Sequence, residues 1–363
     1  MPERAAGAGG DPYAVGREGF SGAVAEARPG SEKPEAGVVA RLRRRKGRAV
    51  TPSDERAGTG SSGAGAPVEP VDEDLAVRPA LVGTSSVVRR VLPTRRRTTV
   101  GAWCFLDHYG PDDVATGPGM DVGPHPHIGI QTVTWLFEGQ AVHRDSLGHT
   151  QVIAPGQLNL MTAGAGIAHA EVSPVPRPRW LHGVQLWVAL PGDQRHRAPA
   201  FEHHPALPVV EFDGGEAVVL VGELAGIPAP STSYTPLVGA EVTLSGPGRS
   251  SIPLEPAFEY AVLGVDGPLQ VAGRTLGAGE GHYLGLSRRA LEVAGSGRFL
   301  LLGGEPLGEP LVMWWNFVGR THEDVVEARA DWEAGRRFPP VPGYEGPRVP
   351  APELPPGRLV GRR

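Results

Sequence analysis

Short apolar runs of four to eight residues recur along the chain from residue 77 onward. Turn residues bound these runs, mostly in pairs that contain Gly, Pro or Asp, and this arrangement predicts strands. Most of the spacings between runs and their turns are near ten residues, which is typical of β-sandwiches and β-barrels. The clearest runs are 131–137, 150–153, 184–190, 218–221, 260–265 and 298–302. The pattern therefore predicts an all-β protein.

One segment near the C-terminus, 322–335, has the period of a helix instead. Gly335 ends it, as Gly commonly does just after the last helical turn. The apolar positions that would share one face of this helix are Val325, Val326, Ala328 and Trp332. We therefore predict one short C-terminal helix.

Changes in composition divide the chain into four segments. Residues 1–77 are rich in Gly, Ala, Ser, Pro and charge and have no persistent apolar period, so we expect a disordered extension. A Pro-rich stretch at 196–208 separates two strand-rich halves, which indicates two similar β units in tandem. The expected boundaries are 1–77 for the extension, 78–200 for the N-terminal unit, 201–345 for the C-terminal unit and 346–363 for a Pro-rich tail.

The overall composition excludes an all-helical protein. The 52 glycines and 38 prolines leave few windows free of both, and they cost about 1 and about 3 kcal/mol in a helix interior. The apolar share of 40% is nevertheless large enough to build a core.

Charge and targeting features point to a cytoplasmic protein. The net charge is −5, so we do not expect a nucleic-acid partner. We interpret the basic run at 41–48 as a solvated charge run, with an electrostatic tether as the alternative. No apolar stretch approaches the roughly 18 residues of a membrane span, and the first 30 residues lack the apolar core of a signal peptide. The single cysteine, Cys104, excludes an internal disulfide.

Histidines in the N-terminal unit have the spacing of metal ligands. His125 and His127 are two residues apart, so a strand would direct both imidazoles to the same face. His169 and Glu171 repeat this spacing further along the chain. If the two strands are neighbours in a small barrel, three nitrogens and one oxygen point into its interior. Such a donor set suits Fe(II), Mn, Co, Ni, Cu or Zn and has too few oxygens for Ca.

Five segments of the N-terminal unit occur in an order typical of a known family. They are FLDH at 105–108, PHPHIG at 124–129, LFEG at 136–139, HRDS at 143–146 and MTAGAGIAHAE at 161–171. Together they resemble the pirin family of bicupins, strongly over 87–191 and more loosely to the end of the predicted helix. The resemblance implies two tandem cupin (jelly-roll-like) β-barrels, of which only the first carries metal. It also implies a mononuclear site, usually iron, bound by His125, His127, His169 and Glu171.

Two positions depart from the patterns of related proteins. Gln131 stands where general cupins have a Glu ligand, and its parity with His125 and His127 predicts an inward amide that hydrogen-bonds beside the metal. The segment 164–166 lacks the Arg that relatives often carry between the two glycines. The C-terminal unit has no paired histidines, so we expect it to be a packing partner without metal.

Several other residues have weaker patterns. His143 is the best candidate for a hydrogen-bonding group behind a ligand, and His108 with Asp107 suggests a structural polar pair. Aromatic and large apolar residues that would line a pocket or fill the core are Trp135, Phe137, Met161 and Trp187.

The resemblance implies a metal-dependent dioxygenase of the quercetin 2,3-dioxygenase type, which opens the central ring of a flavonol with O2 and releases CO. The expected partners are a small aromatic substrate such as a flavonol, O2 and one divalent transition metal, with Fe(II) preferred. We expect Glu171 to take the proton of the substrate hydroxyl. The alternative function is a non-catalytic, metal-dependent binding protein that regulates a transcription factor or a metabolic enzyme, and a further alternative is a cupin without metal.

Overall fold

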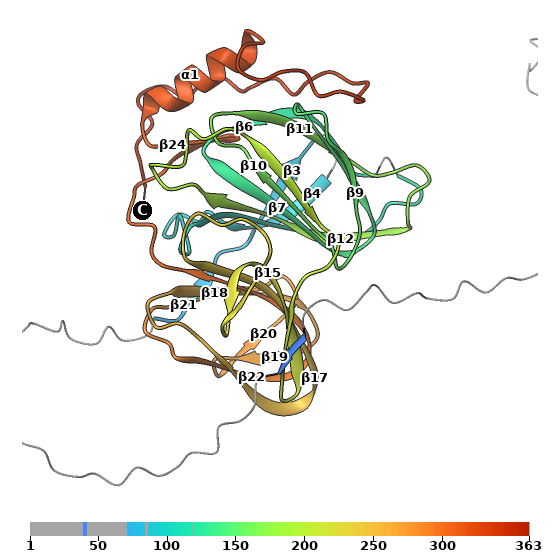
Figure 1. Ribbon diagram of the computed structural model, residues 1–363, viewed down its shortest axis with the longest axis vertical. Helices are drawn as coiled ribbons and strands as arrows, with labels where there is room; N and C mark the ends of the chain where they lie inside the picture. Colours follow the sequence, from blue (N-terminus) through green and yellow to red (C-terminus); the bar gives the residue numbers. More distant parts are fainter. Residues whose placement is uncertain (1–38, 42–70, 84–85, 118, 363) are drawn as a thin grey trace, which may run out of the picture. The chain divides into compact units, whose positions relative to one another are not determined.

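The computed structural model describes residues 39–41, 71–83, 86–117 and 119–362, and these residues form strands with one helix (Figure 1). The all-β prediction with a single short C-terminal helix is confirmed. None of the described helical structure has both the length and the apolar character needed to cross a membrane.

The N-terminal barrel consists of two antiparallel sheets. The larger sheet has seven strands in the order β13-β10-β7-β12-β5-β4-β3, and the smaller has four in the order β6-β11-β8-β9. Buried side chains of both sheets pack together, as Met161 and Trp187 of the larger do with Ile167 of the smaller. The strands are β3 (Arg78–Val82), β4 (Ser86–Leu92), β5 (Trp103–Asp113), β6 (Asp121–His127), β7 (Ile130–Glu138), β8 (Ala141–Asp145), β9 (Thr150–Ile153), β10 (Leu158–Thr162), β11 (Ile167–Val172), β12 (Trp180–Ala189) and β13 (Ala200–His204).

The C-terminal barrel is one curved sheet of eleven strands around a second apolar core. Its main order is β1-β14-β15-β17-β22-β18-β21-β2, and β16, β19 and β20 pair at the side of this path. The strands are β1 (Val39–Arg41), β2 (Glu73–Leu75), β14 (Val209–Phe212), β15 (Gly215–Leu224), β16 (Ile227–Pro228), β17 (Leu237–Pro253), β18 (Glu259–Asp266), β19 (Leu269–Val271), β20 (Arg274–Leu276), β21 (Gly281–Gly285) and β22 (Ala290–Gly304).

Most of residues 1–77, for which we predicted a disordered extension, lie outside the described residues. Two pieces of that block are described, and both are strands of the C-terminal barrel. β1 pairs with β14 in parallel, and β2 pairs with β21 in antiparallel. They form the two ends of the strand order, where an edge strand offers unpaired backbone groups to an added segment. These two pieces therefore differ from the prediction because their backbones complete a sheet.

The two barrels contact each other through a shared apolar cluster and specific hydrogen bonds. The indole of Trp103 donates from Nε1 to the backbone oxygens of Val238 (3.1 Å) and Gly303 (3.2 Å). The indole of Trp135 donates to Oε2 of Glu241 at 2.6 Å. The expected role of the C-terminal unit as a packing partner agrees with these contacts.

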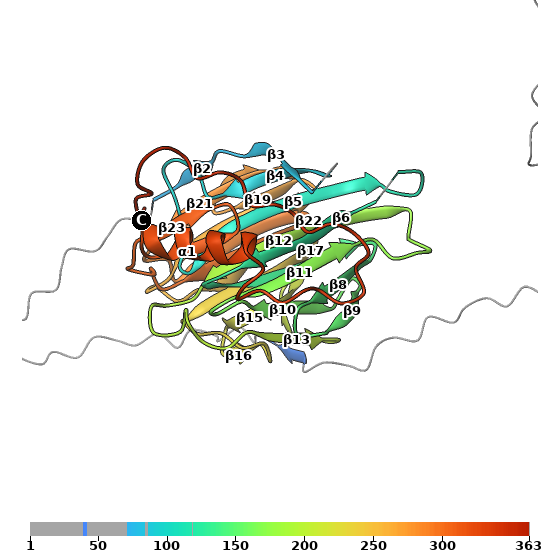
Figure 2. The same cartoon turned by 90° about the horizontal axis from the view of Figure 1, so that it is seen from above.

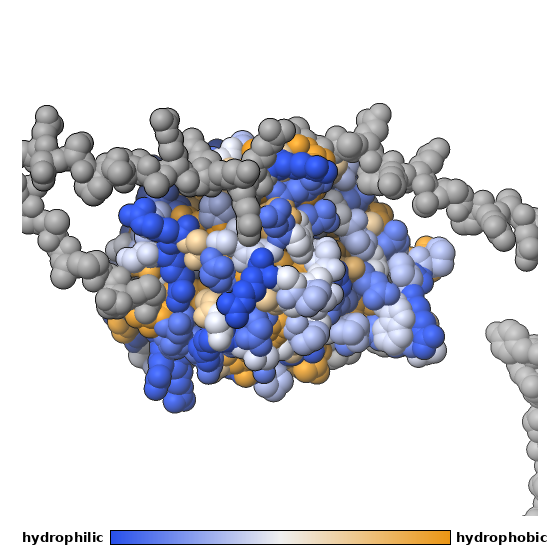
Figure 3. Space-filling model, turned by 90° about the horizontal axis from the view of Figure 1, so that it is seen from below, coloured by the Kyte–Doolittle hydropathy of each residue, from blue (hydrophilic) through white to orange (hydrophobic). Residues whose placement is uncertain are grey.

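On the face of the C-terminal barrel in Figure 3, hydrophilic and hydrophobic residues are mixed wherever the grey chain leaves the surface visible.

The segment after the C-terminal barrel returns to the N-terminal barrel. It forms β23 (Val312–Trp314), β24 (Phe317–Gly319) and α1 (His322–Glu333). β24 lies beside β6 in Figure 1, and α1 lies over β11 in Figures 1 and 2. Thr321 and Asp324 form a capping box that begins the helix. The buried helix residues Val325, Ala328 and Trp332 pack in one cluster with residues of β11. These contacts place the segment 311–345 against the N-terminal barrel, and the boundary expected at 345 stays a prediction.

Candidate metal centre

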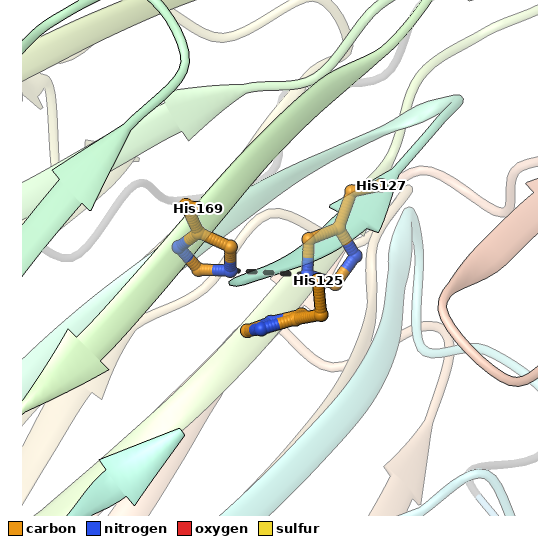
Figure 4. Close-up of side chains that lie close together, drawn as sticks. All are labelled: His125, His127 and His169. Carbon is orange, nitrogen blue, oxygen red and sulfur yellow. Dashed lines mark hydrogen bonds between the residues drawn. The ribbon is translucent and has the colours of Figure 1, made fainter. Parts of the chain in front are cut away.

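Two neighbouring strands bring three imidazoles together. β6 carries His125 and His127 at alternate positions, and its antiparallel neighbour β11 places His169 directly opposite His125. One nitrogen of each ring lies within 4.8 Å of the other two, and Figure 4 shows the three rings converging. All three side chains are buried. Among the described residues, this triad is the group of His, Cys, Asp or Glu side chains that is arranged to hold a metal ion.

Backbone carbonyls set the tautomers of two of these rings. Nδ1 of His125 lies 2.9 Å from the oxygen of Gly123, and Nδ1 of His127 lies 3.2 Å from the oxygen of Asn316. A carbonyl oxygen only accepts, so each Nδ1 carries the hydrogen and donates it. In a neutral imidazole the other nitrogen, Nε2, then has a free lone pair. Both rings are therefore in the form that binds a metal through Nε2.

The close approach of two ring nitrogens fits a bound cation. Nε2 of His127 lies 3.1 Å from Nε2 of His169 (Figure 4), a distance that requires either a hydrogen on one of the two nitrogens or a cation between them. Burial, reinforced by the neighbouring imidazoles, lowers the pKa of His127 and His169 well below the ordinary value of 6.5. Burial also lowers the pKa of His125, to about 4. Since protonation is disfavoured, three neutral nitrogen donors face one point, and this set suits a divalent transition metal.

Glu171 lies in the same cavity but outside the triad. A register shift in the pairing of β11 with β6 separates it from His169, and its carboxylate is not among the atoms that meet within 4.8 Å. Its Oε1 accepts a hydrogen bond of 3.1 Å from Oγ1 of Thr134 on β7. Burial raises the pKa of Glu171 above its ordinary value, although His143 and Thr134 act in the opposite direction. The triad is thus brought together, while ligation by Glu171 stays a prediction.

A cavity of about 640 Å³ opens beside the triad and Glu171. The rings of Phe105 and Trp187 form one wall, stacked at 3.9 Å, and the Trp187 ring meets the His127 ring at 5.0 Å. The guanidinium of Arg90 lies 4.5 Å from the Phe105 ring centre. Both carboxylate oxygens of Asp107 accept hydrogen bonds from Arg90, at 2.8 and 2.7 Å. The cavity can therefore receive a flat aromatic molecule against this wall. The charges of Arg90 and Asp107 beside the wall neutralise each other.

The C-terminal segment supplies part of this cavity, which the sequence pattern did not indicate. Asn316 lines it and holds His127 through its backbone, and Tyr344 closes another side. The hydroxyl of Tyr344 donates to Oδ1 of Asp121 on β6 at 2.9 Å. Neither residue stands in a local motif, so only the return of the chain to the N-terminal barrel reveals them.

The inward position predicted for Gln131 is wrong. Its amide nitrogen donates to Oγ1 of Thr162 and to the backbone oxygen of Thr232, both at 3.0 Å, and it does not line the cavity. β6 ends at His127, and the chain then crosses to β7 in the other sheet through Gly129, whose φ is +70°. Parity holds only within one strand, so it is lost at this crossing.

The other candidate residues divide between the core and the surroundings of the triad. Trp187 lines the cavity and Met161 is buried beside it, whereas Trp135 and Phe137 pack between the barrels. His143 lies behind His169, as the sequence suggested.

Asp107 and His108 do not form a pair. Asp107 binds Arg90, whereas Nε2 of His108 lies 2.8 Å from Nε2 of His182.

Comparisons with known proteins match both barrels. A family model described as Pirin matches residues 85–188, and a model described as Pirin C-terminal cupin domain matches residues 239–339. A Pseudomonas aeruginosa protein provisionally named quercetin 2,3-dioxygenase is 48% identical, over 77% of this chain and 90% of its own length. A pirin-like protein of Caulobacter vibrioides is 39% identical, over 73% of this chain and 94% of its own length.

Solved structures agree with these sequence matches. A crystal structure of quercetin 2,3-dioxygenase from Acinetobacter baumannii is similar with a TM-score of 0.77 and 45% identity, covering 80% of this chain and 97% of that chain. A second structure of that name and organism has a TM-score of 0.67 and 27% identity, covering 73% of this chain and 97% of that chain. The prediction of two cupin barrels is confirmed.

Proposed function

Because the chain belongs to the pirin family, we propose that it is a metal-dependent dioxygenase that opens the central ring of a flavonol with O2 and releases CO. The observation that carries this proposal is the triad itself. Three buried, neutral imidazoles meet at the wall of an aromatic cavity, in a chain whose relatives bear the name of that enzyme.

The triad of His125, His127 and His169 would hold one divalent metal, with Glu171 as a fourth ligand, and we propose Fe(II). A bound transition metal at such a face supplies Lewis acidity toward the deprotonated flavonol and one-electron chemistry toward O2. Three or four protein ligands leave room for substrate, as catalytic sites require.

The cavity residues would bind and orient the flavonol. Its flat rings would lie in the aromatic cavity that Phe105 and Trp187 wall, with the hydroxyl that loses its proton facing the triad. Water is largely excluded at this end, because the triad and Glu171 are buried.

Glu171 would take the hydroxyl proton. Burial raises the pKa of its carboxyl, which makes the carboxylate a stronger base than an exposed one. The hydrogen bond from Thr134 to Oε1 orients the group and leaves Oε2, which would take the substrate proton when it is not bound as the fourth ligand.

Oxygen uptake and CO release with a panel of flavonols, using Fe(II)-loaded protein, test the proposal. We expect the Glu171→Gln variant to lose about 10²- to 10⁴-fold in kcat, the usual contribution of a general base. The matched control is Glu327→Gln, because Glu327 is exposed on α1. Turnover no faster than that of a His125→Ala/His127→Ala double variant would refute the enzyme and favour the non-catalytic binding protein. A protein partner and a cytoplasmic location stay predictions.

A further inference from the structure

A chain of buried polar side chains leads away from His169 on the side opposite the triad. Nδ1 of His169 lies 3.5 Å from Nδ1 of His143 on the neighbouring strand β8. Nε2 of His143 lies 3.1 Å from Oδ2 of Asp145, whose side chain is completely buried. Nδ1 of the half-exposed His149 lies 2.9 Å from the same oxygen. The Phe201 ring stacks on the His143 ring at 4.4 Å and holds it in place.

His169 differs from the other two rings of the triad in what faces its Nδ1. His125 and His127 meet backbone carbonyls, which can only accept a hydrogen bond. His169 meets another imidazole, which donates or accepts according to its own tautomer. The contact with His143 therefore does not by itself decide which nitrogen of His169 carries the hydrogen. The contact of its Nε2 with Nε2 of His127 does not decide it either, because a hydrogen on His169 or a metal ion between the two rings would satisfy that contact.

Asp145 determines which nitrogen carries the hydrogen in both His143 and His169. Its Oδ1 accepts hydrogen bonds from the backbone N–H groups of Leu147 (2.9 Å) and His149 (3.1 Å). Although burial alone would raise the pKa of Asp145, bonds from His143 and His149 lower it below its ordinary value. An ionised carboxylate only accepts, so Nε2 of His143 must donate to it. In the neutral form of this imidazole Nδ1 is then an acceptor, and Nδ1 of His169 donates to it.

We propose that Asp145 is a positioning residue of the metal centre, which acts through His143 to keep the lone pair of His169 on Nε2, facing His127. The proposal rests on metal binding by the triad and does not need flavonol turnover. Carboxylates that orient metal-binding histidines are common, and they usually contact the ligand ring directly. In this chain the orientation passes through a second imidazole.

The substitution Asp145→Asn reverses the tautomers without removing the side chain. The two backbone N–H groups keep the amide oxygen at the place of Oδ1, so the amide nitrogen takes the place of Oδ2. That nitrogen donates, and Nε2 of His143 must accept. Nδ1 of His143 then carries the hydrogen, and Nδ1 of His169 becomes the acceptor. His169 would carry its hydrogen on Nε2, where the metal should bind.

Two measurements test the proposal on the full chain. The first is ¹⁵N NMR of the histidine rings in metal-free protein. We expect His169 protonated at Nδ1 in the wild type and at Nε2 in Asp145→Asn. The second is a titration with Co(II) alone, in competition with a chelator. We expect Asp145→Asn to bind about 10- to 100-fold more weakly, the usual effect of losing a group that orients a ligand.

The control is Asp113→Asn, which makes the same change of charge at an exposed ion pair with Arg179. It should keep the wild-type tautomers and affinity. A wild-type His169 protonated at Nε2 would overturn the proposal, and this measurement needs no variant to fold. Wild-type affinity in a folded Asp145→Asn would overturn it as well. Neither measurement uses flavonol. A protein that shows the expected tautomers and Co(II) affinities but does not turn over flavonols would therefore refute the proposed dioxygenase activity and support the positioning role of Asp145.

Discussion

Replacing His127 by Asn separates metal binding from packing at the triad. The amide nitrogen of Asn can take the place of Nδ1, so the hydrogen bond to the backbone oxygen of Asn316 is kept. Nε2, which meets Nε2 of His169 at 3.1 Å, is removed. The substitution therefore deletes one donor of the triad and leaves the contact that holds β6 to the C-terminal segment.

The expected effect is a loss of stabilisation by metal. A ligand that binds only the folded state at one hundred times its Kd adds about 2.7 kcal/mol to the free energy of unfolding. For a chain of this size that corresponds to a rise in Tm of roughly 4 °C. Without metal, losing a ring that is 1% exposed and packs against Trp187 should cost about 1–3 kcal/mol.

Calorimetry of both proteins, with and without Co(II) at one hundred times the wild-type Kd, measures these quantities. We expect the metal to raise the Tm of the wild type and to leave the Tm of His127→Asn unchanged. His196→Asn, a substitution at an exposed histidine, is the matched control and should respond as the wild type does. If His127→Asn keeps the full rise in Tm, the metal binds elsewhere and the assignment of the triad is refuted.

Three further predictions concern stability and are read from urea unfolding. Gly129→Ala should cost more than about 2 kcal/mol, because φ is +70° and the new Cβ would lie 2.1 Å from a backbone oxygen of β24; an unchanged midpoint would contradict this. Burial lowers the pKa of His108 to about 3 and of His182 to about 4, while the unfolded chain takes up protons near 6.5. The free energy of unfolding should therefore fall as the pH drops from 6.5 toward 4, and His182→Gln should make this dependence shallower; an equal slope would contradict the assignment. Trp135→Phe removes the hydrogen bond to the buried carboxylate of Glu241 and should cost about 1.5–3 kcal/mol, and a negligible loss would show that the bond does not hold the barrels together.

Local periodicity was enough to predict many of the strands and the paired histidines. The run at 131–137 corresponds to β7 and the run at 184–190 to the end of β12. His125 and His127 share a face because side chains alternate along one strand, whatever the rest of the chain does. The same spacing occurs at His143 and Asp145 on β8, and this was the signal that could have revealed Asp145.

Other features of the site depend on contacts between distant segments. Gln131 follows His127 closely in sequence, yet the crossing at Gly129 turns it away from the cavity. Asn316 lies 189 residues from His127 and still sets its tautomer. The residues of β1 and β2 have no local pattern that predicts strands. They are strands because their backbones pair with β14 and β21 at the edges of a sheet.

The sequence by itself determined that this chain is built of strands, and which histidines share a strand face. These properties follow from the two-residue period of an extended backbone, which needs no distant partner. The tertiary structure decided which strands are neighbours, where the chain changes sheet, and which carbonyls and carboxylates hold the rings of the triad. Such contacts form where segments far apart in sequence bury their apolar faces together, and local spacing does not encode that pairing.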